Sequence, residues 1–427
     1  MPDLPLDQIQ GLVLRGYTHP RARHFMINIP NAAAGKKFVA AVTPMITTAK
    51  PWGVKPRTCY NIAFTKDGLH ALGIDVPNAG LVPQFVEGAI ARGGSQVGPS
   101  SDLGDHGASA PTNWILGLGT GDVHIILSLF AVDAEARDRG TDIVNSTMAS
   151  AGVQPRGHQD ADDVLGDSRI HYGYHDGISQ PNIDGAPPRK NPDDQPIVST
   201  GEFVLGYNAE GGLLRPGPSF DPANGTYSAF RILKQDVDAF FEYLNAAAAL
   251  YDLTPEAVQA KFCGRWADGT PLVLSPETPD PSASLNNFNY IPNDKPARSC
   301  PIASHIRRSQ RRNEDNQQHR LLRRAAPYGP PYVPKDGLER GLTGHFICSS
   351  LEMQYEFIMT QWVNGSTVTG LSRDPLLGAI DDANPPRFQL YWKGDKKSLE
   401  GFGRFTTTRG GAYCYLPSIA GLQTLSA

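Results

Sequence analysis

The sequence predicts an α+β sandwich, and three observations lead to that class. Candidate strands and helices follow one another in β–α–β order in both halves of the chain, an arrangement that packs helices against sheets. Hydrophobic residues make up 40% of the 427 positions, which is enough for a large interior. The 44 glycines and 36 prolines together form nearly a fifth of the chain, against about 12% on average, so long connecting loops are expected.

The first half predicts two β–α–β units. The strongest strand signal is the run of β-branched and apolar residues at 122–132, and a long helix follows it directly. We expect strands at 24–29, 59–64 and 122–132, and helices at 31–48, 68–72 and 134–151.

A segment rich in glycine, proline and aspartate at 173–217 separates the halves, and its composition forbids long regular elements. It is expected to be a functional loop or a crossover. Beyond it, 235–250 places Val237, Phe240, Phe241 and Leu244 on one helical face. Thr254 and Pro255 are a favourable cap and first residue for the next helix. Strands are expected at 227–233 and 411–417, and a helix at 353–363.

The charge balance excludes some classes of protein. A net charge of −4 gives no global attraction to nucleic acid or to an anionic membrane, so neither is expected as a partner.

The longest apolar run, 125–132, is far shorter than the roughly 20 residues that span a bilayer. Five widely spaced cysteines form neither a disulfide framework nor a zinc motif. The N-terminus does not read as a secretory signal, so a cytoplasmic location is the default; a leader removed beforehand would make the protein secreted.

The first candidate site is the segment HYGYHDGISQP at 171–181. Two histidines four residues apart, His171 and His175, would share a helix face as metal ligands, but the glycines at 173 and 177 argue against a helix. The same glycines let the backbone approach a large ligand and aim Asp176 at it. The alternative is an ordinary Asp-Gly turn.

The second candidate is an unusually basic stretch. Between 295 and 324, 30 positions hold nine basic residues: Lys295, Arg298, Arg307, Arg308, Arg311, Arg312, Arg320, Arg323 and Arg324. His305 lies inside this stretch, where nearby cations favour the neutral ring that a metal requires. The cations would suit an anionic ligand such as a carboxylated cofactor; the alternative is a solvated basic face that binds nothing.

Together the two segments match the requirements of a haem peroxidase, namely an axial ligand, a proton acceptor and a cation near the reacting peroxide. The sequence resembles the dye-decolorizing peroxidase family, specifically its larger fungal and actinobacterial branch. The resemblance rests on motifs in order along nearly the whole chain: IQGLVLRGY (9–17), VHIILSL (123–129), GYHDGISQP (173–181), NGTYSAFRILKQDV (224–237), GRWADGTPL (264–272), CPIASHIRR (300–308), RRAAPYGP (323–330), QYEFIMTQWVNG (354–365), RDPLLG (373–378) and RGGAYCYLPS (409–418).

The resemblance implies roles for particular residues. His305 matches the proximal haem ligand, which is also the metal ligand, and Asp374 resembles the carboxylate that bonds its imidazole. Asp176 matches the distal acid–base carboxylate. Arg323 matches the distal arginine, with Arg324 as the alternative one position later.

The resemblance also implies a cofactor-binding role for Arg308, as a propionate partner, and for Gly177 and Phe346. Where another family member has leucine in a GLLF-like segment, this chain has His345, which puts the shape and polarity of the distal pocket in question.

The family fold implies two ferredoxin-like halves with peripheral helices, with the haem held mainly by the C-terminal half. The expected divisions are an N-terminal half at 1–172, a distal loop and crossover at 173–225, and a C-terminal half at 226–427. The implied cofactor is one haem b per chain, and a homo-oligomer is left open as an alternative to a single chain. The implied activity is the reduction of hydrogen peroxide with oxidation of dyes, phenols or other aromatic reductants through a ferryl intermediate.

Two other functions remain open from the residues. A haem-binding or iron-handling protein with little turnover would share His305 but would not need both Asp176 and Arg323. A non-haem metal hydrolase would use His171, His175 and Asp176. Surface electron transfer through Trp266, Trp362, Trp392 or Tyr328 is a further hypothesis, and its alternative is that each is an ordinary core aromatic.

Overall fold

The computed structural model describes residues 4–94, 103–163, 165, 166, 168–187, 195–312, 317–365, 373–380 and 386–427. Residues 188–194 of the expected crossover and residues 313–316 of the basic stretch therefore lie outside the described residues. Among the described helices, none is both long and apolar enough to cross a bilayer.

The N-terminal half is a four-stranded antiparallel sheet with strand order β2-β3-β1-β4. Two helices make the chain order β–α–β–β–α–β, which is ferredoxin-like. The elements are β1 (Arg21–Asn28), α2 (Ala32–Val42), β2 (Thr58–Phe64), β3 (Ile125–Ala131), α6 (Ala134–Ala151) and β4 (Gln154–Asp162). Helix α6 has the bounds that the sequence predicts, because Asp133 caps its first turn and Gly152 ends it in the left-handed conformation.

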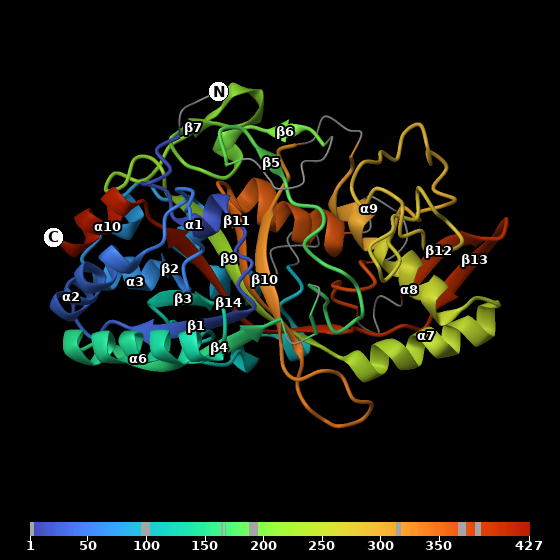
Figure 1. Ribbon diagram of the computed structural model, residues 1–427, viewed down its shortest axis with the longest axis horizontal. Helices are drawn as coiled ribbons and strands as arrows, with labels where there is room; N and C mark the ends of the chain where they lie inside the picture. Colours follow the sequence, from blue (N-terminus) through green and yellow to red (C-terminus); the bar gives the residue numbers. More distant parts are fainter. Residues whose placement is uncertain are drawn as a thin grey trace.

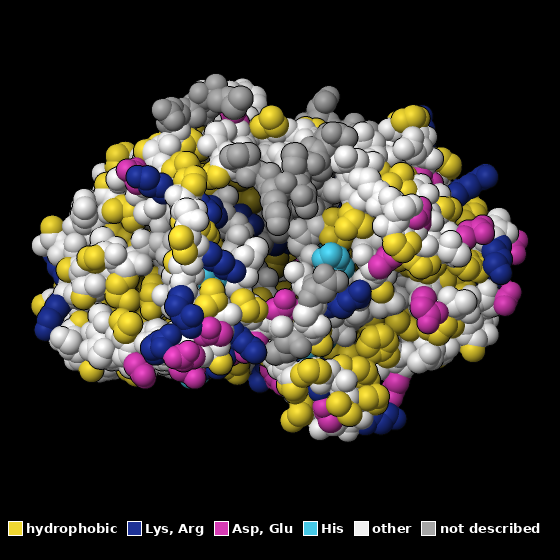
Figure 2. All heavy atoms as spheres, viewed as in Figure 1, with side chains coloured by type: hydrophobic (Ala, Val, Ile, Leu, Met, Phe, Trp, Pro, Cys, Tyr) yellow, Lys and Arg dark blue, Asp and Glu magenta, His cyan; other side chains and the backbone are white. Residues whose placement is uncertain are grey.

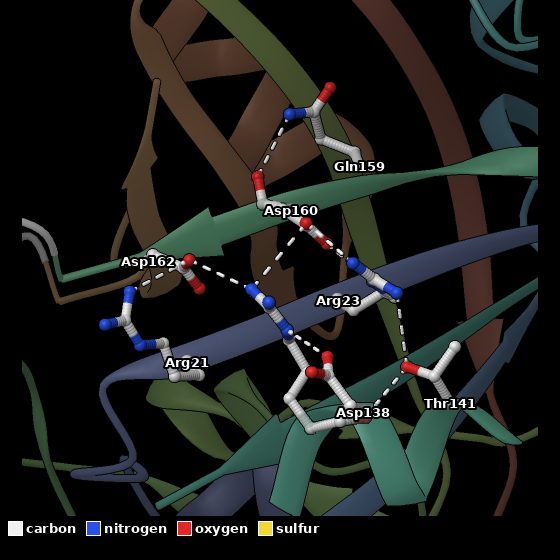
Figure 3. A network of polar contacts seen from close by, with 8 residues as sticks. Arg21, Arg23, Asp138, Thr141, Gln159, Asp160 and Asp162 are labelled. Atoms are coloured by element: carbon white, nitrogen blue, oxygen red, sulfur yellow. Dashed lines mark hydrogen bonds and ion pairs between the residues drawn. The ribbon is translucent and has the colours of Figure 1, made fainter. Parts of the chain in front are cut away.

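Ion pairs fasten the edge strand β4 and helix α6 to β1 (Figure 3). Arg23 on β1 makes a two-pronged contact with Asp160 on β4, with N···O distances of 2.6 and 2.8 Å. Arg137 on α6 and Arg21 on β1 both bond Asp162, each at 3.1 Å. The alternating charges hold three elements together at the rim of this sheet.

The C-terminal half repeats the topology with strand order β10-β11-β9-β14. Its elements are β9 (Thr226–Gln235), α7 (Val237–Tyr251), β10 (Leu322–Tyr328), β11 (Gly341–Cys348), the π-helical turns η7 (Leu351–Glu356) and η8 (Ile358–Val363), and β14 (Thr406–Leu416). Residues 353–363 were expected to form an ordinary α-helix, and the chain is helical there but wound more widely. Strands β4, β10 and β11 were not predicted from the sequence.

The two sheets meet at a narrow seam. Strand β14 pairs with β2 only through Tyr415 and Phe64, which joins the two sheets edge to edge. At the opposite edges, Cα atoms of β4 come within 8 Å of those of β10 and β11, so the sheets curl round to face each other. The structure thus confirms an α+β sandwich of two ferredoxin-like halves.

A polar group lies between the two sheets, and we call it the inter-sheet cluster: His24, Ser128, Ser228 and His345. Ser128 Oγ contacts His24 Nδ1 at 2.8 Å and His345 Nε2 at 3.5 Å, and Ser228 Oγ contacts His345 Nδ1 at 2.9 Å. All four side chains are buried. Because two members come from each half, the cluster links the halves through their shared core.

A second lobe extends from the C-terminal half, at the opposite end of the molecule from α2 and α6 (Figure 1). It has its own apolar core and contains α7, α8 (Pro255–Cys263), α9 (His305–Ser309) and the hairpin of β12 (Arg387–Trp392) and β13 (Asp395–Glu400). Thr254 caps α8, as predicted.

The remaining elements are short. The helices are α1 (Gly11–Leu14), α3 (Lys66–Ala71), α4 (Pro83–Glu87), α5 (Ala89–Gly94) and α10 (Ile419–Ser426). The described part of the crossover contains the two-residue strands β5 (Asn182–Ile183), β6 (Ile197–Val198), β7 (Tyr207–Asn208) and β8 (Leu214–Arg215). The absence of longer elements among these residues agrees with the predicted crossover.

Candidate functional site

His305 is the first residue of the short helix α9, and its imidazole is held by a buried carboxylate. His305 Nδ1 lies 2.9 Å from Asp374 Oδ2, and Asp374 is completely buried. The other carboxylate oxygen of Asp374 accepts the backbone N–H groups of Leu376 and Leu377, at 2.9 and 3.0 Å. These contacts fix the ring orientation and leave Nε2 as the ring nitrogen for a ligand.

Electrostatics reinforce the pair. Burial alone would lower the pKa of His305, but the charge and hydrogen bond of Asp374 outweigh it, so the pKa is raised. Burial would likewise raise the pKa of Asp374, but His305 holds it below its usual value. The carboxylate is therefore ionised and makes the imidazole a stronger electron donor.

Arg308 lies one helical turn after His305 and is fully buried. Its guanidinium donates to Val363 O at 3.3 Å and is electrostatically coupled to Asp374. Burial lowers the pKa of Arg308. This places the predicted propionate partner beside the His305–Asp374 pair.

The GxxDG segment is a loop rather than a helix. Gly173 and Gly177 have φ values of +86° and +77°, which only glycine adopts readily. The backbone N–H groups of His175 and Asp176 bond Ala267 O and Ser168 O, at 3.0 and 2.9 Å. These bonds hold the backbone that leads into the Asp176 side chain.

His171 and His175, which the sequence offered as a possible pair of metal ligands, do not form a metal site. His171 is buried and its Nε2 contacts Tyr328 O at 2.8 Å. Within the described ranges, no group of three or more His, Cys, Asp or Glu residues is arranged to hold a metal ion. The described part of the chain therefore offers no set of ligands for the non-haem metal hydrolase considered from the sequence.

Strand β10 presents its two neighbouring arginines to opposite faces, as strand geometry requires. Arg323 Nη1 donates to Ser179 O at 3.1 Å, so its guanidinium lies against the GxxDG loop. Arg324 donates to Leu12 O and Val13 O, the carbonyls of α1. Arg323 therefore lies beside the predicted site, and Arg324 points toward the N-terminal segment.

Phe346 and His345 on β11 separate in the same way. Phe346 is the cross-strand partner of Arg323, so the two side chains share a face. His345 is the partner of Arg324 and belongs to the inter-sheet cluster. His345 thus lies in the core between the sheets, away from the face that carries Arg323 and Phe346.

Two of the predicted residues, Arg323 and Asp176, lie within electrostatic reach of His305. His305 is electrostatically coupled to both Arg323 and Asp176, and no hydrogen bond joins it to either of these described residues. A third of the His305 side chain is exposed although protein surrounds it, which indicates that the ring faces a hollow. Figure 2 shows the molecular surface hollowed near its centre, with a histidine and basic side chains beside the opening. Such a space between an imidazole and an acid–arginine pair fits a bound haem.

The aromatic residues singled out as surface relays are buried: Trp266, Trp362, Trp392 and Tyr328 are each no more than 8% exposed. This favours their reading as core aromatics. Ser179 and Gln180, which contact Arg323 directly, were not predicted as site residues. Their position immediately after the GxxDG motif was the available signal.

Comparisons with known proteins agree with this architecture. No family model matches the chain. It is 29% identical to peroxidase 2 of the fungus Mycetinis scorodonius over 99% of this chain and 88% of that one. It is 25% identical to a multifunctional dye peroxidase of the bacterium Amycolatopsis, over 98% of this chain and 96% of that protein.

Solved structures resemble it over their whole length. An ancestral D-type dye-decolorizing peroxidase superposes with a TM-score of 0.83 at 26% identity, covering 100% of both chains. A dye-decolorizing peroxidase complexed with 2,6-dimethoxyphenol gives 0.83 at 25% identity, covering 99% of this chain and 100% of that one. In fold and in sequence, the chain is thus similar over nearly its full length to dye-decolorizing peroxidases of fungi and of an actinobacterium.

Proposed function

We propose that this protein is a haem peroxidase that reduces hydrogen peroxide and oxidises dyes and phenolic or other aromatic compounds. The observation that carries the proposal is that the His305–Asp374 pair lies within electrostatic reach of both Asp176 and Arg323. A haem-binding protein without turnover would not require the acid–arginine pair.

One haem b per chain is the proposed cofactor. His305 would ligate the iron through Nε2, Arg308 would meet a propionate, and Phe346 and Gly177 would line the pocket. When bound, the haem would supply an iron that binds peroxide and takes up its oxidising equivalents.

The protein residues would manage protons and charge. Asp176 would accept a proton from one peroxide oxygen and deliver it to the other, which leaves as water. Arg323 would stabilise the negative charge that develops as the O–O bond breaks. Asp374 would keep the proton on His305 Nδ1 and so maintain the ring orientation. Two one-electron donors would then return the site to its starting state.

Aromatic donors are proposed from the relatives, one of which is a dye-decolorizing peroxidase solved with 2,6-dimethoxyphenol. We also propose that the chain divides into parts at 1–172, 173–225 and 226–427, which is supported by the repeated strand order on either side of the crossover.

A cytoplasmic location is supported by five free, buried cysteines. Assembly of identical chains is a further proposal, to be checked by light scattering.

The proposal is tested with the haem-loaded chain. An absorption spectrum should show a Soret band, and stopped-flow mixing with peroxide should shift it rapidly. Asp176→Asn and Arg323→Leu should slow that reaction by about a hundred-fold or more. Arg324→Leu is the matched control, because its guanidinium bonds α1 instead, and it should react like the wild type.

The outcomes separate the alternatives. Absence of a Soret band after haem addition would refute haem binding. A Soret band with a slow wild-type reaction would indicate a haem-binding protein without turnover. Wild-type rates in both Asp176→Asn and Arg323→Leu would contradict the assigned roles.

A further inference from the structure

Gln180 holds the backbone of Arg323 through both ends of its side-chain amide. Gln180 Oε1 accepts the Arg323 N–H at 3.2 Å, and Gln180 Nε2 donates to Arg323 O at 3.1 Å. The preceding residue, Ser179, accepts a hydrogen bond from the Arg323 side chain at 3.1 Å. Two consecutive loop residues thus fix both the main chain and the guanidinium of Arg323.

The contact satisfies backbone groups that the sheet leaves unpaired. β10 ends the C-terminal sheet, and its one hydrogen-bonded neighbour among the described strands is β11. In an antiparallel pair, alternate residues direct N–H and C=O away from the partner strand. Arg323 is such a residue, and the Gln180 amide takes the place that a further strand would fill.

The same loop connects the two sides of the site. Asp176 lies four residues before Gln180. Ser179 Oγ donates to Gln310 Oε1 at 2.9 Å, and Gln310 ends the helix that begins with His305. The short loop therefore relates the positions of the carboxylate, the guanidinium and the imidazole.

We infer that Gln180 is a positioning residue for the peroxide reaction, because it sets the place of Arg323 relative to Asp176. The inference rests on the proposed function. Misplacement of a reacting group by about 1 Å can lower a rate by about a hundred-fold. Loss of the two Gln180 bonds to the Arg323 backbone should therefore lower the rate of the peroxide reaction measurably.

The N-terminal half contains a matched control. Gln10 makes the same two bonds to Ile62 of β2, accepting its N–H at 2.9 Å and donating to its O at 2.8 Å. β2 and β10 are the second strands of their βαββαβ units, and each glutamine precedes the first strand of its unit. Gln10 also bonds Asn61 and Pro417, far from the predicted site in the sequence.

The experiment compares Gln180→Met, which keeps length without the amide, with Gln10→Met. A second variant, Gln180→Asn, keeps the amide but shortens its reach. Haem-loaded proteins are mixed with peroxide and, separately, with hydrogen cyanide, whose binding requires loss of a proton but no turnover. Both Gln180 variants should lower both association rate constants by about ten- to a hundred-fold. Gln10→Met should lower the Tm and leave both rates within about two-fold of wild type, since its bonds are structural.

Hydrogen exchange on the haem-free chain gives an independent measurement. The Arg323 amide should exchange faster in Gln180→Met than in the wild type, because its acceptor is gone. Wild-type rates with peroxide and cyanide in both Gln180 variants would overturn the inference, whether or not the amide exchanges faster. If Arg323→Leu is slow while the Gln180 variants are fast, only the positioning role fails. If Arg323→Leu itself reacts like wild type, the role proposed for Arg323 fails and the inference with it, whereas a slow wild-type reaction with peroxide would refute the proposed function.

Discussion

Acidification is expected to weaken the contact between the two sheets, because the inter-sheet cluster contains histidines that resist protonation. Burial lowers the pKa of His24 to about 4, and the charge of Asp160 offsets this only partly. Burial and the neighbouring His24 also lower the pKa of His345. In the unfolded chain each ring would titrate near 6.5.

The direction and the size of the effect on stability follow from the linkage between proton binding and folding. A histidine whose folded-state pKa is depressed stabilises the fold fully above about pH 6.5, and this stability is lost as pH falls toward 4. For His24 the difference between values of 6.5 and about 4 corresponds to about 2.5 kcal/mol of lost unfolding free energy between pH 7 and pH 4.5. This is a large fraction of a typical domain stability of about 5–15 kcal/mol. His345 acts in the same direction.

The assay measures urea unfolding of the wild type and His24→Gln at pH 7 and pH 4.5. Glutamine can still bond Ser128 but does not titrate over this range. The wild type should lose about 2.5 kcal/mol more than His24→Gln, while effects of haem release and of surface carboxylates are common to both. His70→Gln is the matched control, because His70 is exposed.

If the unfolding free energies of the wild type and His24→Gln depended equally on pH, the reasoning would be refuted. His24 would then have the same pKa in the folded and the unfolded chain. A difference reproduced by His70→Gln would also refute it, because the effect would then not come from burial.

Three further predictions concern other contacts. Asp374→Asn should speed haem release by about ten- to a hundred-fold, measured by transfer to apomyoglobin, because the imidazole loses its charged anchor; unchanged release would contradict the role of Asp374. Asp221→Ala should lower the unfolding free energy by about 3 kcal/mol in urea titrations, because buried donors of Tyr415 and Ser418 lose their acceptor; a loss below about 1 kcal/mol would argue against that network. Gly344→Ala should lower the Tm and speed hydrogen exchange in β10, because Gly344 has φ +152° and a Cβ there would overlap a β10 carbonyl oxygen; unaltered exchange would show that the strand pair tolerates the side chain.

Local signals predicted the elements that carry their own caps or strong periodicity. Helix α6 is bounded by Asp133 and Gly152, both readable from the chain. β10 was missed because its sequence, LRRAAPY, has two charges and a proline and no alternation. Its strand conformation comes from pairing with β11, which depends on residues about 20 positions away.

The candidate site was predictable at the level of motifs but not of orientation. The sequence could not distinguish Arg323 from Arg324, because a shift of one residue in strand register exchanges the two faces. The structure separates them through their different acceptors. Gln180 was not predicted, because an amide that bonds another residue's backbone leaves no signature beyond its neighbourhood to the motif.

The narrow seam at Tyr415 and Phe64 has a consequence for synthesis. The N-terminal sheet is built from strands between 21 and 162, so it can fold soon after it leaves the ribosome. β14 is the last strand of the eight in chain order, and it lies between β9 and β2. The two halves therefore become one sheet only when translation has passed Leu416. Until then, the edges of β9 and β2 that pair with β14 lack their partner strand.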